Sequence, residues 1–171
     1  GVQTCALPIY GIDIESWNPM TDPEIPYHFN KVNAQTSKRD NKLALQRELG
    51  LQEDGNVMLV GVVSRLTWQK GFYLLMEKLN ELCAAPIQLA VLGSGEPLIE
   101  EKMAQLEAGN KGKIVFYRGY NESLAHRIYA ACDLFLMPSL FEPCGISQLI
   151  SMRYGTLPLV RETGEIGRAS C

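Results

Sequence analysis

The sequence contains no apolar run close to the ~20 residues that a membrane-spanning helix needs. It also lacks an excess of charge of either sign, because 16 Lys and Arg face 19 Asp and Glu and leave a formal net charge of -3. This balance provides no basic surface for nucleic acid or for anionic lipid headgroups. We therefore expect neither nucleic acid nor a membrane among its partners.

Side chains that ligate metals are few and scattered. Only two histidines are present, His28 and His126, and the five cysteines have no spacing typical of a metal site. We therefore expect no metal cofactor and interpret the cysteines as reduced thiols of a cytosolic protein. The first residues lack a basic segment followed by a long apolar one, so no secretory signal is expected and a cytoplasmic location is favoured.

The two ends of the chain have features of a non-native origin. Ala6 to Ile9 can be encoded by GCT CTT CCG ATC, and Glu165 to Ala169 by GAG ATC GGA AGA GCG. The core of the second DNA string is the reverse complement of the first, and both resemble a common sequencing-library adapter. Opposite ends of a natural gene have no reason to mirror each other, so residues 1–9 and 165–171 are interpreted as assembly scars.

Residues 10–38 are rich in Pro, Asn and Asp and have little hydrophobic periodicity. Turn signals at 17–19 and 22–23 predict an ordered connector that once joined another domain. A helix is predicted over 39–49, where leucines recur until Gly50 supplies a stop signal.

From residue 57 the chain alternates between apolar runs and helical periodicity. The segment 57–63 is continuously apolar, as expected of a strand buried on both faces of a sheet. Strands that alternate with helices predict βαβ units and a parallel sheet. The predicted fold class is therefore α/β, a Rossmann-like parallel sheet with flanking helices, in one incomplete domain over 39–164. The predicted strands are 57–63, 87–92, 113–117, 134–137 and 157–160, and the predicted helices between them are about 72–82, 98–106, 122–131 and 145–154.

Cations, glycines and one carboxylate come directly after these strands. In a parallel sheet all the carboxyl ends meet at one edge, and ligands bind there. This combination of residues predicts a site for an anionic, polyhydroxylated ligand. The segments that follow the five strands are 64–71, 93–96, 118–122, 138–145 and 161–164.

Two cations, Arg65 and Lys70, flank the loop after the first strand. Arg offers a planar fork and Lys a point charge, so together they could clamp a diphosphate. They could equally be solvated loop cations. Gly93, in a Gly-Ser-Gly turn after the second strand, could let the backbone approach a phosphate or a base, although a plain tight turn explains it as well.

Three further positions have the chemistry of a nucleotide-sugar site. Tyr120 could stack on a nucleobase, or it could be a surface tyrosine that packs locally. Glu142 could bond to sugar hydroxyls, or it could be a helix-capping acid. Gly145 opens a predicted helix whose first turn, with Ser147, could receive phosphate oxygens.

Three groups of motifs cover nearly all of residues 10–164 and are jointly very specific. They are Tyr10-Gly11-Ile12-Asp13 with Trp17-Asn18-Pro19; Ser64-Arg65-Leu66 with Gln69-Lys70-Gly71; and Phe141-Glu142-Pro143-Cys144-Gly145 with Gln148-Leu149 and Arg153-Tyr154-Gly155-Thr156-Leu157-Pro158. These motifs resemble, in turn, the interdomain segment, the phosphate-binding loop and the donor-sugar segment of bacterial glycogen synthases and plant starch synthases.

The resemblance implies one part of a two-domain GT-B glycosyltransferase. Such an enzyme transfers glucose from ADP-glucose to the non-reducing end of an α-1,4-glucan, with retention and without a metal. By the same resemblance Arg65 and Lys70 stabilise the departing diphosphate, and Glu142 holds the glucose hydroxyls. The donor-binding positions implied are Gly93, Tyr120 (against the adenine), Cys144, Gly145 and Ser147.

Some positions depart from the family pattern. Related GT-B families often have a second Glu eight positions after the first, and here that position is Ile150.

The amino-terminal domain of the family is absent, so we expect this chain to lack activity alone. The expected location is the bacterial cytosol, or a plastid if the source is a plant. The alternatives left open are another GT-B enzyme that uses a UDP-sugar and a non-catalytic nucleotide-sugar-binding module.

Overall fold

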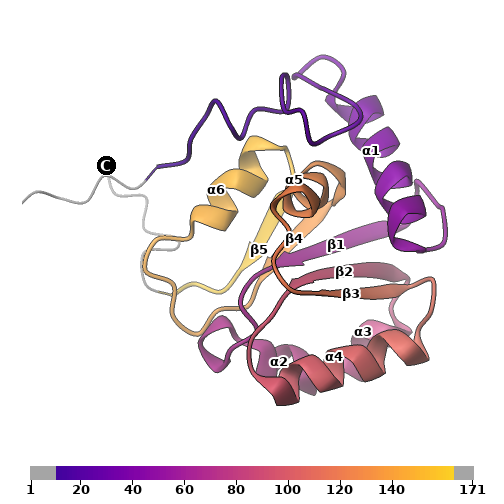
Figure 1. The fold of residues 1–171 in the computed structure, drawn as a ribbon, viewed down its shortest axis with the longest axis vertical. Helices are drawn as coiled ribbons and strands as arrows, with labels where there is room; N and C mark the ends of the chain where they lie inside the picture. Colours follow the sequence, from indigo (N-terminus) through magenta and orange to yellow (C-terminus); the bar gives the residue numbers. More distant parts are fainter. Residues whose placement is uncertain (1–10, 164–171) are drawn as a thin grey trace, which may run out of the picture.

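A computed structural model describes residues 11–163 of the chain, so the two suspected scars lie outside the described residues. Five parallel strands form one sheet in the order β3-β2-β1-β4-β5, with helices on both faces (Figure 1). The predicted α/β fold class is thereby confirmed. The elements are α1 (Ala34–Leu49), β1 (Met58–Val63), the 3-10 helix η1 (Trp68–Lys70), α2 (Phe72–Glu77), α3 (Leu79–Ala84), β2 (Ile87–Gly93), α4 (Pro97–Gly109), β3 (Ile114–Arg118), α5 (Glu122–Ala131), β4 (Leu134–Met137), α6 (Ile146–Arg153) and β5 (Leu157–Val160).

The sheet separates two hydrophobic cores. One face is covered by α2, α3 and α4, and the other by α1, α5 and α6 (Figure 1). Strand β1 pairs with both β2 and β4 and is buried over its central residues, as its continuous apolar run predicts. Every expected strand lies within one residue of its predicted bounds.

Helix α1 begins at Ala34, so the predicted start at residue 39 is wrong. The buried face of this helix is polar and includes Lys42 and Gln46. Lys42 Nζ lies 2.7 Å from Asp133 Oδ2, in an ion pair between α1 and the sheet. Because polar side chains pack here, hydrophobic periodicity does not report where the helix begins.

The predicted helix over 72–82 is two short helices. Helix α2 ends at Glu77 and α3 begins at Leu79. At Lys78 the backbone N–H bonds to Leu75 O, which tightens the last turn of α2 and interrupts the helical ladder. In the described part of the chain no helix is both long and apolar enough to cross a membrane.

The connector packs on the domain as part of its core. Its residues Ile25 and Phe29 are buried among residues of α1, α5 and α6. Buried Asp22 accepts hydrogen bonds from the Tyr154 hydroxyl and, at 2.7 Å, from His126 Nδ1. The segment 11–33 is therefore fixed by a buried polar contact as well as by apolar packing.

His126 has a structural role. It is buried on α5, and the Trp17 ring stacks on it with 3.8 Å between ring centroids. Tyr154 lies against the same group, and burial, followed by the hydrogen bond to Asp22, raises the pKa of its phenol. An aromatic and hydrogen-bonded cluster thus ties the connector to α5 and to the end of α6.

Candidate functional site

The strand order reverses between β1 and β4, which lie side by side at the centre of the sheet. The chain runs outward from β1 through β2 to β3 and then returns to the other side of β1. In open parallel sheets the loops on either side of such a point diverge and leave a crevice at the carboxyl ends of the strands. The loops after β1 and β4 hold most of the polar residues singled out in the sequence.

Lys70 and Glu142 meet at this point. Lys70 Nζ lies 2.6 Å from Glu142 Oε2, although the two residues are 72 positions apart. The Ser139 hydroxyl donates to the same oxygen at 3.2 Å. A small cavity of about 20 Å³, close to the volume that holds one water, lies beside this group. Its lining is Val62, Val63, Ser64, Lys70, Phe72, Leu136, Met137, Pro138, Ser139, Glu142 and Ser147.

The alternative interpretation of Glu142 as a helix-capping acid is wrong. The residue that caps α6 is Gly145, with φ +71°, and no side chain caps this helix. Glu142 instead bonds to a lysine and a serine and is 7% exposed. A carboxylate held in this way, with both of these contacts from residues 11–163 on one oxygen, is suited to accept hydrogen bonds from a polyhydroxylated ligand through the other.

The loop that carries Arg65 and Lys70 is held by the loop after β2. Leu66 pairs with Gly95 in an isolated parallel bridge, and Glu96 N donates to Leu66 O at 2.8 Å. The Glu96 carboxylate accepts from Trp68 N at 2.7 Å and from the Tyr73 hydroxyl at 2.9 Å. The hydrogen bond to Glu96 is the main cause of the raised pKa of the Tyr73 phenol. The loop is therefore positioned before any ligand binds.

Two glycines are required by close backbone contacts rather than by a ligand. A Cβ at Gly93 would lie 1.9 Å from Ser64 O, and a Cβ at Gly71 would lie 1.9 Å from Pro138 O. Gly71 also has φ +74°, in the left-handed region. These contacts bring the loops after β2, β1 and β4 against one another, which explains Gly93 without excluding a nearby phosphate.

The first turn of α6 borders the same cavity. Ser147 lines it, and Gly145 opens the helix as predicted. Burial raises the pKa of neighbouring Tyr129 to about 12, and a hydrogen bond with Ser147 opposes that rise. Cys144 is half-buried in the loop between β4 and α6. Lys70, Glu142, Gly145 and Ser147 therefore form one continuous site.

Arg65 and Tyr120 lie at the rim and are not brought into that cluster. Both are exposed, Tyr120 to 80%, and within residues 11–163 no ion pair forms to the Arg65 guanidinium. Their side chains are available to a ligand above the sheet edge, so their roles stay predictions.

Two residues of the site were not singled out from the sequence. Ser139 stands three positions before Glu142, and Glu96 follows the Gly-Ser-Gly turn that contains Gly93. Both lie in loops that directly follow strands, and this position is the sequence feature that could have identified them as site residues. Their contacts, however, join different loops, and local sequence does not show which loops touch.

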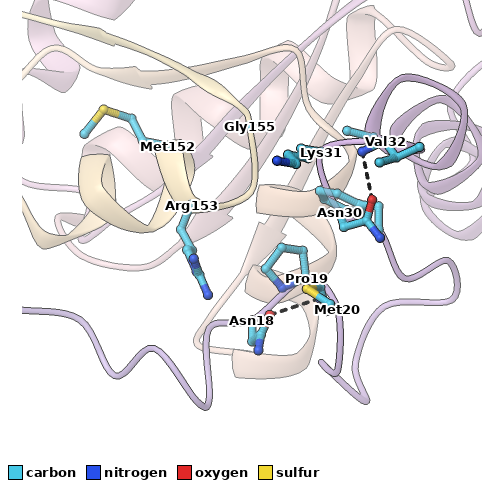
Figure 2. A pocket seen from close by; sticks show the side chains of 11 residues that line it. Asn18, Pro19, Met20, Asn30, Lys31, Val32, Met152, Arg153 and Gly155 are labelled. Atoms are coloured by element: carbon cyan, nitrogen blue, oxygen red, sulfur yellow. Dashed lines mark hydrogen bonds between the residues drawn. The ribbon is translucent and has the colours of Figure 1, made fainter.

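A larger hollow of about 570 Å³ lies away from this site, between the connector and the ends of α1 and α6. Figure 2 shows Arg153 of α6 and Asn18, Met20 and Val32 of the connector side around it. None of the predicted site residues lines this hollow. Its lining residues include no ion pair and none of the loops that follow β1 and β4.

The donor atoms for a metal are not assembled in the described region. Among residues 11–163 there is no group of three or more His, Cys, Asp or Glu side chains that could hold an ion. The second-Glu position of related families, Ile150, is buried in the hydrophobic core. Beside the small cavity, the described residues therefore offer the Glu142 carboxylate and the adjacent Lys70 cation.

Comparisons with known proteins place these residues in a family. The family described as glycosyl transferases group 1 matches residues 57–169. The glycogen synthase of Lachnospira eligens is 49% identical over 156 residues, which are 91% of this chain and 33% of that protein. The glycogen synthase of Geobacillus thermodenitrificans is 49% identical over 154 residues, 90% of this chain and 32% of that protein.

A solved structure is similar over nearly the whole chain. The catalytic domain of starch synthase IV from Arabidopsis thaliana, bound to ADP and acarbose, aligns with a TM-score of 0.87 and 39% identity. The alignment covers 95% of this chain and 34% of that one. The chain thus spans about a third of the length of the relatives it matches.

Proposed function

Since this chain belongs to the group 1 glycosyl transferases, we propose that it forms the donor-binding part of a glycogen- or starch-synthase-type glucosyltransferase. The donor is ADP-glucose and the acceptor is the non-reducing end of an α-1,4-glucan. The observation that carries this proposal is the Lys70–Glu142 pair at the carboxyl ends of β1 and β4. The starch synthase bound to ADP and acarbose supports the choice of nucleotide and glucan.

The roles of the residues follow from their chemistry. The Lys70 ammonium and the Arg65 guanidinium stabilise the charge that develops on the departing diphosphate. Glu142 accepts hydrogen bonds from glucose hydroxyls through the oxygen that does not bond to Lys70 and Ser139. Tyr120 stacks on the adenine at the rim. The remaining donor-binding positions are Gly93, Cys144, Gly145 and Ser147.

The transfer breaks the bond between glucose C1 and the diphosphate and forms a bond from C1 to the acceptor oxygen. We propose retention at C1 without a two-glutamate mechanism, since Ile150 occupies the second position. The amino-terminal domain of a two-domain GT-B enzyme supplies the acceptor contacts. The isolated chain is therefore expected to transfer no glucose, and detectable incorporation of glucose into glycogen would contradict this expectation.

The test is calorimetric titration of the purified chain with ADP and with UDP. We expect ADP to bind more tightly and the double variant Arg65→Ala, Lys70→Ala to lose at least tenfold in affinity. The matched control is Arg47→Ala, Lys78→Ala, which removes the same charges from exposed ion pairs elsewhere. A clear preference for UDP would indicate a different sugar-nucleotide enzyme. Equal losses in both double variants would refute the phosphate roles.

We further propose that donor binding needs no divalent ion, because Arg65 and Lys70 provide the positive charge. Titrations with and without EDTA are expected to give the same affinity, and a loss of binding in EDTA would overturn this point. The bacterial cytosol is the proposed location, in keeping with the bacterial sources of the glycogen synthases above.

A further inference from the structure

We infer that Ser139 is a positioning residue that, with Lys70, holds Glu142 by one oxygen and reserves the other oxygen for the sugar of the donor. This inference rests on the proposed function and goes beyond it by assigning a role to a residue outside the predicted site. It concerns how the carboxylate is aimed once the nucleotide sugar has bound.

The two donors to Glu142 converge on the same atom. Lys70 Nζ at 2.6 Å and Ser139 Oγ at 3.2 Å both bond to Oε2. Neither of these hydrogen bonds from residues 11–163 involves Oε1, and Glu142 lines the small cavity. The carboxylate is thereby held by Oε2, which leaves Oε1 for a ligand.

A bound diphosphate is expected to attract Lys70 more strongly than Ser139. The Lys70 side chain is 19% exposed and its ammonium has three donor positions, so an arriving diphosphate competes with Glu142 for its charge. Ser139 is 2% exposed and neutral, so a diphosphate attracts it far less than it attracts the lysine. Ser139 therefore keeps Oε2 in place when Lys70 turns toward the phosphate oxygens.

This arrangement predicts that loss of the Ser139 hydroxyl affects binding of ADP-glucose and of ADP differently. Loss of the Ser139 hydroxyl leaves Glu142 held only by a lysine that the diphosphate draws away. Binding of ADP-glucose should suffer, because the carboxylate no longer meets the glucose hydroxyls in a fixed orientation. Binding of ADP, which has no glucose, should change little.

The experiment is a double-mutant cycle on the affinities for ADP-glucose and for ADP, measured by calorimetry with Ser139→Ala, Glu142→Ala and both together. We expect Ser139→Ala to weaken binding of ADP-glucose about five- to tenfold and binding of ADP less than twofold, the scale of one hydrogen bond. In the Glu142→Ala background the same change should have no further effect on the ratio of the two affinities.

The control variant is Ser151→Ala, which removes an equally buried hydroxyl that bonds to Gln148 O on α6, away from the site. It should leave the ratio unchanged. Circular dichroism establishes that each variant is folded, and Ser139→Cys, which keeps the volume but donates weakly, replaces Ser139→Ala if the latter does not fold.

Equal loss for both ligands, or a loss that persists without Glu142, would overturn the positioning role while leaving the proposed function intact. Failure of the unsubstituted, folded protein to bind ADP would count against the proposed function itself, and the inference would fall with it.

Discussion

Lys38 is a lysine whose protonation is strongly affected by folding. Its Nζ donates to Ala130 O at 2.9 Å and to Thr156 Oγ1 at 2.8 Å. Burial is the main cause that lowers its pKa from 10.5 to about 8. Between these two pH values the unfolded chain binds a proton that the folded chain does not, so this group makes the protein more stable as pH rises from 8 to 10.5.

A Lys38→Met variant tests this linkage. Relative to the variant, the unsubstituted protein should gain stability as pH rises through that window, by up to ~1.4 kcal/mol per pH unit. Burial raises the pKa of Cys132 to about 12, and the charge of Lys38 opposes that rise, so the two proteins are compared from pH 8 to 9, where this thiol is mostly protonated in the folded and the unfolded chain. Urea unfolding at several pH values provides the measurement, and parallel pH profiles would show the prediction to be wrong.

Gly71 is the backbone position where a side chain is least tolerable. Gly71→Ala combines a positive φ with contact against Pro138 O, so we expect a loss of more than about 2 kcal/mol of unfolding free energy and weaker ADP binding. Gly109→Ala is the matched control, since its Cβ would meet nothing within 4 Å. Chemical denaturation and calorimetry measure the two effects. Similar stability of the two variants would contradict the role given to the loop contact.

Among the elements, the connector depends on one buried carboxylate. Asp22→Ala would leave His126 and Tyr154 buried without their acceptor, and we expect a loss of about 3–5 kcal/mol. Asp13→Ala, at an exposed position of the same segment, should leave the unfolding midpoint nearly unchanged. Thermal unfolding followed by circular dichroism compares the two. Equal midpoints would mean that the connector does not contribute to the stability of the domain.

The strands and most helices could be predicted because their periodicity follows from simple burial. Strand β1 is buried on both faces, and α5 lies over the predicted residues 122–131. The start of α1 could not be predicted in this way, because Lys42 and Gln46 pack through polar groups. The positions of Lys70 and Glu142 could be predicted singly. Their pairing could not, because it depends on β4 returning to the side of β1, which the alternation of elements leaves open.

For the whole molecule, the exposed apolar surface around β5 and α6 bears on cooperativity. Leu157 and Leu159 are 67% and 54% exposed, and Ile146 and Met152 of α6 are exposed as well. Such a surface is normally covered in a stable domain, so we expect the isolated chain to have a low unfolding midpoint and a broad transition. Differential scanning calorimetry measures this, and a sharp cooperative transition would argue against it.

The two edge strands of the sheet, β3 and β5, limit the pairing of strands from other chains with this sheet. On β3 the Glu107 carboxylate accepts the N–H of Phe116, so this donor is already occupied. On β5, Leu157 N bonds to Asp133 O, and strand alternation turns Pro158, which has no N–H, toward the unpaired side. Each edge thus withholds a backbone donor from a strand that would add to it.

Pro158→Val would restore the missing donor. We expect the variant to form oligomers at concentrations where the unsubstituted chain sediments as a monomer, as measured by analytical ultracentrifugation. Phe116→Val changes an edge residue without adding a donor and should not associate. Identical sedimentation of all three proteins would show that the proline is irrelevant to association. In the described sheet, then, an imino acid on one edge and a carboxylate from α4 on the other each remove a backbone donor, which opposes the edge-to-edge pairing from which fibrils grow.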